Sequence, residues 1–273
     1  MMMFDNKEKI LLSTSEISLY DLVHELLLIL HNNFNTKRIK SSKKPGSNNI
    51  NDEDNDNNIF DFTNEEKVIS FAIKDFTEKF RSKISDLFYY IRKSIHDCSK
   101  CQIVTGYSSD ICFSCTLNPD LASIYLEKID LKIIDLFKFY KIKILYCDIY
   151  EECPKCGTII KDIKKSNIFY TSLPNLILYI LYKEKDIFNL TLDESINIKD
   201  FIERTDVSKV DYRLVGAIFT EDFEDEKKYI SITRNIQLND GSWIYYNGNS
   251  IKRCSFKELV NHKNLKMLFY TTE

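Results

Sequence analysis

Apolar residues recur at helical spacing in two stretches of the N-terminal third of the chain. Residues three and four positions apart lie on one side of an α-helix, so such a stripe predicts an amphipathic helix. We therefore expect one helix over residues 17–34 and further helix over residues 65–95. The first stripe consists of Leu19, Leu22, Val23, Leu26, Leu27 and Leu30, and the second of Val68, Phe71, Ala72, Phe76 and Phe80.

The pattern changes from about Asn167 onward, where short runs rich in aromatic and β-branched residues replace the helical spacing. Runs of this length and composition predict β-strands. A short helix is expected over residues 257–262, before the last strand. Helices followed by a series of strands indicate an α+β fold. The expected strands are residues 173–182, 212–219, 228–234, 243–246 and 266–270.

Residues 36–58 interrupt the pattern with a segment too polar to bury. A basic cluster leads into Pro45 and Gly46, and an Asn- and Asp-rich tract follows at residues 48–58. Composition of this kind predicts a disordered insertion. We interpret the basic cluster as a solvated linker face, with a nuclear localisation signal as the weaker alternative. Its members are Lys37, Arg38, Lys40, Lys43 and Lys44.

Composition narrows the class of protein. The chain has 273 residues, 44% of them hydrophobic, which is enough apolar mass for one large domain or two small ones. A formal net charge of -3 gives no general attraction to nucleic acids or anionic membranes. The longest apolar runs, such as residues 26–30, are too short to cross a bilayer, and the first residues do not resemble a secretion signal. We therefore expect an intracellular protein, cytoplasmic, nuclear or both.

Three Cys-x-x-Cys pairs lie between residues 98 and 156. Structural disulfides rarely persist in a reducing compartment, so paired cysteines there indicate metal ligands. Two such pairs complete the closed four-thiolate shell of a structural zinc site, and a glycine after the last pair allows the positive φ that such turns often need. Spacing alone slightly favours a compact ribbon of the first two pairs, and reduced core cysteines are the remaining alternative. The pairs are Cys98/Cys101, Cys112/Cys115 and Cys153/Cys156.

A series of short motifs extends from residue 84 to near the C-terminus. In this order the series resembles the ubiquitin-specific protease family, the papain-like cysteine deubiquitinases. The order of the motifs supports the resemblance more strongly than any single motif does. Residues 17–83 resemble the family only in their helical pattern of apolar residues. The motifs are Ile84–Phe88 (ISDLF), Cys98-x-x-Cys101, Cys153-x-x-Cys156, Leu173–Leu178 (LPNLIL), Tyr212–Val215 (YRLV), Lys228–Ile232 (KYISI), Trp243–Asn247 (WIYYN) and Leu268–Tyr270 (LFY).

The resemblance implies a papain-like fold with a helical thumb, a zinc-bearing fingers subdomain and an antiparallel β palm. It also selects among the cysteines. The middle pair falls where the family has an apolar strand, which implies core thiols, with a rearranged metal site as the alternative. A structural Zn²⁺ ion is therefore expected at Cys98, Cys101, Cys153 and Cys156. The implied segments are a reduced thumb (1–35), a disordered linker (36–60) and a protease-like domain (61–273) that is helical at 61–97, fingers at 98–166 and palm at 167–273.

The catalytic positions depart from the family pattern. The family's general base is the His of a Gly-His-Tyr triplet, which here reads Lys227-Lys228-Tyr229. An ammonium group with a pKa of about 10.4 is protonated at neutral pH and does not deprotonate a thiol. The family's orienting Asp corresponds to Asn247, which would have no imidazole to orient. No cysteine precedes Cys98, so the family's Asn-x-x-Cys-Tyr nucleophile box has no counterpart.

Other candidate residues do not replace the missing groups. Cys254 is interpreted as an ordinary palm residue, and the palm strand that opens with Leu-Pro ends with Lys183-Glu184 where the family has Arg-Phe. The histidines are interpreted as surface or core residues. They are His24, His31, His96 and His262.

These departures indicate a catalytically inactive pseudo-deubiquitinase that binds ubiquitin or another protein partner. The acidic segment at residues 221–226 (EDFEDE) could attract the basic tail of ubiquitin, although a solvated turn is the favoured interpretation. Two alternatives stay open: an active but divergent or truncated cysteine deubiquitinase, and an inactive scaffold in an RNA-processing complex. No nucleic-acid or membrane partner is expected.

Overall fold

The computed structural model describes residues 18–34, 63–98, 100–142, 144–153, 155–169, 175–181, 188–203, 210–223, 226–235, 241–248, 250–260 and 264–272. The expected insertion at 36–58, with its basic cluster, lies outside the described residues. The same holds for Leu173, Pro174, Lys183, Glu184 and His262.

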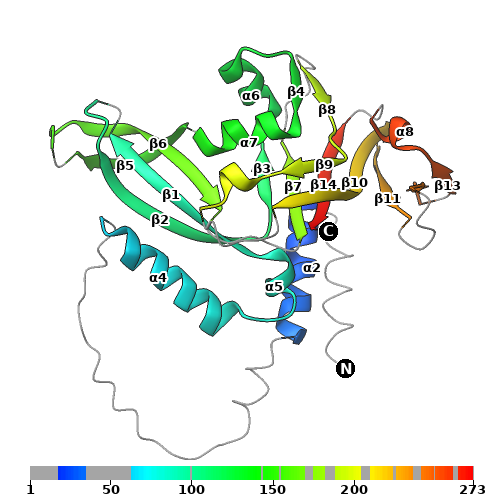
Figure 1. The fold of residues 1–273 in the computed structure, drawn as a ribbon, viewed down its shortest axis with the longest axis horizontal. Coiled ribbons are helices and arrows are strands. Elements are labelled where there is room, and N and C mark those ends of the chain that lie inside the picture. The colour runs from blue at the N-terminus through cyan, green and yellow to red at the C-terminus, as the bar shows by residue number, and fades with distance from the viewer. Residues whose placement is uncertain are drawn as a thin grey trace, which may run out of the picture.

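Among the described residues, eight strands form one sheet, which we call the palm sheet (Figure 1). Neighbouring strands are antiparallel except for the parallel pair at one end, β3 and β7. In spatial order the strands are β13 (Ile251–Cys254), β12 (Trp243–Tyr246), β11 (Glu226–Arg234), β10 (Asp211–Phe223), β14 (Leu265–Thr272), β7 (Asn175–Ile180) and β3 (Cys115–Leu117), and β9 (Ser195–Asn197) pairs with β10.

Four further strands form an antiparallel sheet, which we call the fingers sheet. The helix α4 (Glu65–Asp75) lies beside it and leads into a π-helical turn, η1 (Phe76–Phe80) (Figure 1). Two short strands, β4 (Asp130–Lys132) and β8 (Asn189–Thr191), pair in parallel, and η2 (Lys199–Phe201) is a 3₁₀ turn. In spatial order the strands of the fingers sheet are β2 (Val104–Cys112), β1 (Tyr90–Cys98), β6 (Ile159–Phe169) and β5 (Ile144–Glu152).

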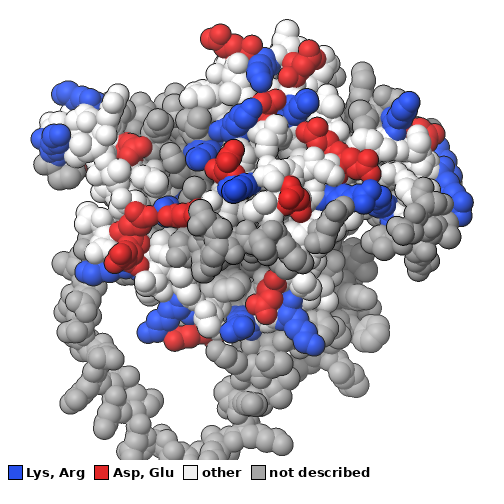
Figure 2. Space-filling view, viewed as in Figure 1, with Lys and Arg blue, Asp and Glu red and all other residues white. Residues whose placement is uncertain are grey.

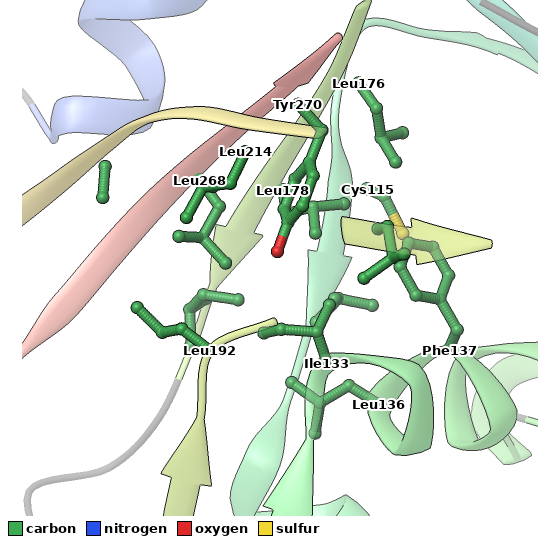
Figure 3. Packing of buried hydrophobic residues seen from close by; sticks show 14 of the residues in the cluster. Cys115, Ile133, Leu136, Phe137, Leu176, Leu178, Leu192, Leu214, Leu268 and Tyr270 are labelled. Atoms are coloured by element: carbon green, nitrogen blue, oxygen red, sulfur yellow. The ribbon is translucent and has the colours of Figure 1, made fainter. Parts of the chain in front are cut away.

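Helices cover both faces of the palm sheet. Side chains alternate between the faces of a strand, so Leu176 and Leu178 of β7 pack toward α7 (Ile133–Ile142), whereas Ile177 packs in a second cluster with α2 (Leu19–Phe34). Figure 3 shows the α7 side of this core, where side chains of α7 point toward those of β7 and β14. The helices α6 (Pro119–Leu126), α5 (Ser85–Phe88) and α8 (Phe256–Val260) complete the described fold.

The expected palm strands are confirmed. β12 spans the residues that the sequence predicts, and β10, β11 and β14 contain their predicted ranges and extend them. Of the expected strand at 173–182, the described part contains β7. The α+β architecture therefore agrees with the pattern of aromatic and β-branched runs.

The helix expected over residues 65–95 is interrupted at residues 81–84 and is wrong beyond Phe88. Residues 90–98 form β1, which pairs with β2 on one side and β6 on the other. Tyr90 and Ile91 are both buried, as are Lys93 and Ser94, so both faces of this strand are covered. Burial on both faces removes the polar–apolar alternation that identifies a half-buried strand. Strand structure thus begins at Tyr90, well before Asn167.

Lys93 joins three segments from within the structure. Its Nζ lies 2.6 Å from Oε1 of Glu65, in the first turn of α4, and 2.6 Å from Oε1 of Glu203, which follows η2. Burial alone would lower the pKa of Lys93, but the hydrogen bonds and charges of the two carboxylates outweigh burial and raise it. The ammonium group is therefore a charged link between α4, β1 and the η2 segment.

We expect Lys93→Met to lower the free energy of unfolding by about 2 kcal/mol, because two carboxylates lose their shared cation but remain partly hydrated. Urea unfolding of the variant measures this loss. A triple variant that adds Glu65→Gln and Glu203→Gln should recover most of it, since no charge is then left unpaired. If the single and triple variants were equally destabilised, packing and not charge would explain the effect.

Candidate metal centre and catalytic positions

The end of β1 forms a tight knuckle around the first cysteine pair. The Cys98 N–H donates to the Ile103 carbonyl at 2.9 Å, and the Gln102 N–H donates to the Cys98 carbonyl at 2.9 Å. Gln102 has a φ of 54°, in the left-handed region. In this turn the backbone N–H groups of Lys100 and Cys101 hydrogen-bond to the Cys98 sulfur, which favours its thiolate form.

The third cysteine pair forms a second knuckle with the same bonding. The Cys153 N–H donates to the Thr158 carbonyl at 2.9 Å, and the Gly157 N–H donates to the Cys153 carbonyl at 2.9 Å. Gly157 has a φ of 61°, which confirms the positive φ expected after Cys156. The first knuckle places a glutamine at the equivalent position, so glycine is favoured there but not required.

The two knuckles bring four sulfurs together. Cys98 Sγ lies 3.7 Å from Cys156 Sγ, and Cys101 Sγ lies 3.5 Å from Cys153 Sγ. All four ligand atoms lie within 4.8 Å of one another. In a tetrahedral site with Zn–S bonds of about 2.3 Å, sulfurs are about 3.8 Å apart. The donor set and its spacing therefore fit a structural Zn²⁺ ion, with no ligand position left for substrate.

Hydrogen bonds from neighbouring groups favour the thiolate form of Cys98 and of Cys156. The Cys101 backbone N–H lowers the pKa of the Cys98 thiol. The Thr158 side chain and backbone N–H lower the pKa of Cys156 to about 6. Burial raises the pKa of Cys101 to about 12, so this thiol needs a bound cation to ionise at neutral pH.

The two cysteines of the middle pair lie apart from this cluster. Cys112 pairs with Tyr90, at the end of the β1–β2 hairpin away from Cys98. Eight residues of β1 separate these ends, which corresponds to about 26 Å at 3.3 Å per residue. Cys115 is fully buried beside Phe137 in the palm core (Figure 3). The compact ribbon of the first two pairs is therefore excluded, and Cys112 and Cys115 are core thiols.

The two residues that the sequence analysis assigns to the family's catalytic positions lie on β11 and directly after β12, which are neighbouring strands. Lys228 is exposed on β11, in register with Glu221 of β10. Asn247 directly follows β12, and its Oδ1 accepts from the Ser250 N–H at 2.9 Å and from the Ser250 hydroxyl at 3.0 Å. The Asn247 side chain therefore stabilises its own turn. Cys254 is half-buried at the end of β13 and packs against the palm core.

The described imidazoles take part in packing elsewhere. His24 on α2 stacks on Phe113 with 4.9 Å between ring centroids. His31 is buried, and its Nδ1 lies 2.8 Å from Ser82 Oγ. His96 lies on β1, where its Nε2 is 3.0 Å from Ser108 Oγ of β2. These contacts agree with the interpretation of all three as surface or core residues.

The start of α2 lies beside the palm sheet, a placement that the sequence reasoning missed. Ser18 caps this helix: its hydroxyl donates to Asp21 Oδ2 at 2.6 Å and accepts from the Asp21 N–H at 3.2 Å. The Tyr20 ring lies 5.2 Å from the ring of Tyr179 on β7. Burial raises the pKa of Tyr179, and the charges of Tyr229, Asp21 and Tyr20 raise it further. The N-terminus of α2 and β11 thus flank one tyrosine.

The acidic segment at residues 221–226 belongs to a β-hairpin. Residues 221–223 end β10 and Glu226 begins β11, with Phe223 in register with Glu226. Residues 224–225 lie outside the described residues. The described part of the segment is thus strand, and the solvated turn that the sequence favours stays a prediction for residues 224–225.

The chain belongs to the ubiquitin carboxyl-terminal hydrolase family, whose family model matches residues 15–270. This match confirms the resemblance to ubiquitin-specific proteases and includes the cysteine knuckles, Lys228 and Asn247. A search of curated proteins found no match.

Solved structures with the same fold include SAGA DUB modules containing Ubp8, Sgf11, Sus1 and Sgf73. One, bound to monoubiquitin, is 18% identical with a TM-score of 0.55, over 76% of this chain and 46% of that chain. Another, with a shortened Sgf11, is 18% identical with a TM-score of 0.58, over 92% of this chain and 50% of that chain. A yeast module is 17% identical with a TM-score of 0.56, over 75% of this chain and 45% of that chain. The chain therefore spans about half the length of the chains it matches.

Proposed function

We propose that this chain binds ubiquitin without hydrolysing ubiquitin conjugates. The proposal rests on Lys228, an exposed lysine on β11 that the sequence analysis assigns to the family's general-base position. An ammonium group cannot accept the proton of a thiol at neutral pH. The amide of Asn247 stabilises its own turn, and the described imidazoles take part in contacts elsewhere.

In the proposed protein, the fingers sheet and the palm sheet together hold ubiquitin, and β3 (Cys115–Leu117), although within the predicted fingers range of residues 98–166, belongs to the palm sheet. We propose Cys98, Cys101, Cys153 and Cys156 as the zinc ligands. The ion would join the end of β1 to the β5–β6 connection, two segments more than fifty residues apart in sequence. Its role would be structural: it fixes the tip of the fingers sheet and supplies no activated water, because the four thiolates fill its shell.

Two further points support a binding role. One solved structure of this fold is a module bound to monoubiquitin, and another is bound to ubiquitin aldehyde. Both are assemblies of several named subunits, so we also propose that this chain acts within a larger protein complex. We place it inside the cell, in the cytoplasm or nucleus, where ubiquitin is found. Within the described residues, no helix combines the length and the hydropathy needed to cross a membrane.

A ubiquitin derivative with an electrophile at its C-terminus tests the absence of hydrolysis. We expect no covalent adduct by intact-mass spectrometry, because the family's nucleophile box has no counterpart and Lys228 replaces the base. An active family member treated in parallel shows that the reagent is competent. An adduct on any cysteine of this chain, lost when that cysteine is changed to serine, would establish an active enzyme instead.

Titration of the chain into isotopically labelled ubiquitin tests binding separately. In two-dimensional NMR spectra of ubiquitin, we expect saturable chemical-shift changes at residues confined to one face. If the fingers contact ubiquitin, the Cys98→Ser, Cys153→Ser variant should bind ubiquitin more weakly and need a higher concentration to saturate these changes. A titration without changes, combined with no adduct, would favour the scaffold role over the ubiquitin-binding role.

A further inference from the structure

β13 lies at one edge of the palm sheet. It pairs with β12 on one side, and no described strand lies on its other side (Figure 1). α8 follows it directly and packs inward, with the Phe256 ring 5.8 Å from the ring of Trp243 on β12. The outer side of β13 is therefore an open strand edge among the described residues.

The register shows which backbone groups face outward. The Asn247 N–H donates to the Ser250 carbonyl at 3.3 Å, so these two residues form a hydrogen-bonded pair at the β12–β13 turn. Hydrogen-bonded and non-bonded pairs alternate along an antiparallel ladder. Lys252, opposite Tyr245, is thus bonded to β12, whereas the N–H and C=O groups of Ile251 and Arg253 face away from β12.

The side chains of this edge combine an apolar residue with two cations. The Ile251 side chain is 73% exposed, and Lys252 and Arg253 are both exposed. Consecutive residues point to opposite faces of a sheet, so positive charge lies on both faces of the edge. The Lys252 ammonium lies 4.6 Å from the centroid of the Tyr245 ring, which holds it near the strand. Figure 2 shows Lys and Arg side chains gathered where β13 forms the edge of the molecule.

We propose that β13 binds an extended acidic peptide of a partner protein, which adds to the palm sheet as a further strand. The outward groups of Ile251 and Arg253 would pair with the peptide backbone, as in strand addition at other sheet edges. The matching peptide carries an apolar residue opposite Ile251 and two consecutive acidic residues opposite Lys252 and Arg253.

Charge selects this occupant over a second copy of the chain. Two β13 strands paired with each other would place lysine and arginine side chains from both copies side by side. Like charges directly opposite in a ladder are destabilising. A short, cationic edge also discourages pairing with chains that lack complementary charge. An acidic strand removes this penalty and gains two charge pairs.

The probe is a fluorescein-labelled peptide, Thr-Glu-Glu-Ile-Glu-Glu-Thr, which presents the required order in either strand direction. The control peptide replaces each Glu with Lys. By fluorescence polarisation, we expect the full chain to bind the acidic peptide and not the basic one. The Lys252→Glu, Arg253→Glu variant should bind the acidic peptide at least about tenfold more weakly and reverse the preference. Lys74→Glu, on α4 far from this edge, should leave binding unchanged.

A second pair of variants separates strand addition from simple charge attraction. Arg253→Ala and Arg253→Pro remove the same charge, but only proline removes the outward N–H, and proline is tolerated at a sheet edge. We expect Arg253→Pro to bind about fivefold more weakly than Arg253→Ala, which corresponds to one lost hydrogen bond. Fluorescence of the single tryptophan, Trp243 on the neighbouring strand, reports whether each variant keeps its fold.

Three results would overturn the proposal. Wild-type chain that does not bind the acidic peptide excludes the site. Equal binding by Arg253→Ala and Arg253→Pro excludes strand addition. A concentration-dependent dimer in sedimentation experiments that is lost in Arg253→Pro would assign the edge to a second copy of the chain.

Discussion

The Cys98→Ser, Cys153→Ser variant is expected to contain no zinc, whereas the wild-type chain should contain one Zn²⁺ ion per molecule. Together the two substitutions remove one ligand from each knuckle, and the two remaining thiols cannot complete a tetrahedral shell. Because binding of a structural zinc ion contributes about 10–16 kcal/mol to small zinc domains, the tip of the fingers sheet should lose its order. Elemental analysis measures the metal, and hydrogen exchange measures the order of residues 98–103 and 153–158.

The matched control changes the pair that the structure places in the core. Cys112→Ser, Cys115→Ser should retain one zinc ion per molecule even if its stability falls, since these thiols lie at the far end of the hairpin from Cys98. Zinc lost in this control and kept in the first variant would mean that the metal is held by the compact ribbon.

Phe137→Ala should lower the free energy of unfolding by about 4 kcal/mol, the cost of losing a large buried ring. Phe137 is fully buried between α7 and the palm sheet, and its ring lies 5.5 Å from the ring of Phe201. The substitution removes the ring and leaves a cavity that strands on one side and α7 on the other cannot close (Figure 3). Equilibrium unfolding in urea measures the change.

Leu121→Ala on α6 is the control for Phe137→Ala. Its side chain is 47% exposed, so its loss should change stability by no more than about 0.5 kcal/mol. Phe137→Ala should also keep its zinc, because the metal site lies in the fingers sheet. A stability loss below about 1 kcal/mol for Phe137→Ala would contradict the packing described for this core.

Sequence patterns predict the palm better than the fingers, for a physical reason. Trp243–Tyr246 is bounded by polar residues and is predicted with its observed bounds, because short runs of aromatic and β-branched residues have few alternative structures. β1 is buried on both faces, so its pattern lacks alternation and continues the helical spacing before it. α6 and α7 were not predicted, although Asn118 caps α6 through Leu121 N–H and a proline opens the helix. That capping signal is present in the sequence.

At the candidate metal site, too, the sequence predicts the local turns but not which of them lie together in the fold. Spacing identifies each Cys-x-x-Cys knuckle, because the knuckle is a local turn. It does not show which knuckles meet, since this depends on the β1–β2 register and on the return of the chain through β5 and β6. The order of family motifs supplied that choice. The placement of Tyr179 between α2 and β11 depends on tertiary packing alone, and no spacing in the sequence indicates it.

The last described strand of the chain occupies a central place in the palm sheet. β14 lies between β10 and β7, although both of these strands precede it in the sequence. During synthesis, β7 and β10 are therefore complete before β14, and each has one unpaired edge. The two strands become part of one sheet only when residues 265–272 pair with both. Pairing of this kind is slow, because distant segments must meet before any contact stabilises them. Until residues 265–272 pair with both strands, the facing edges of β7 and β10 stay open to pairing with other chains.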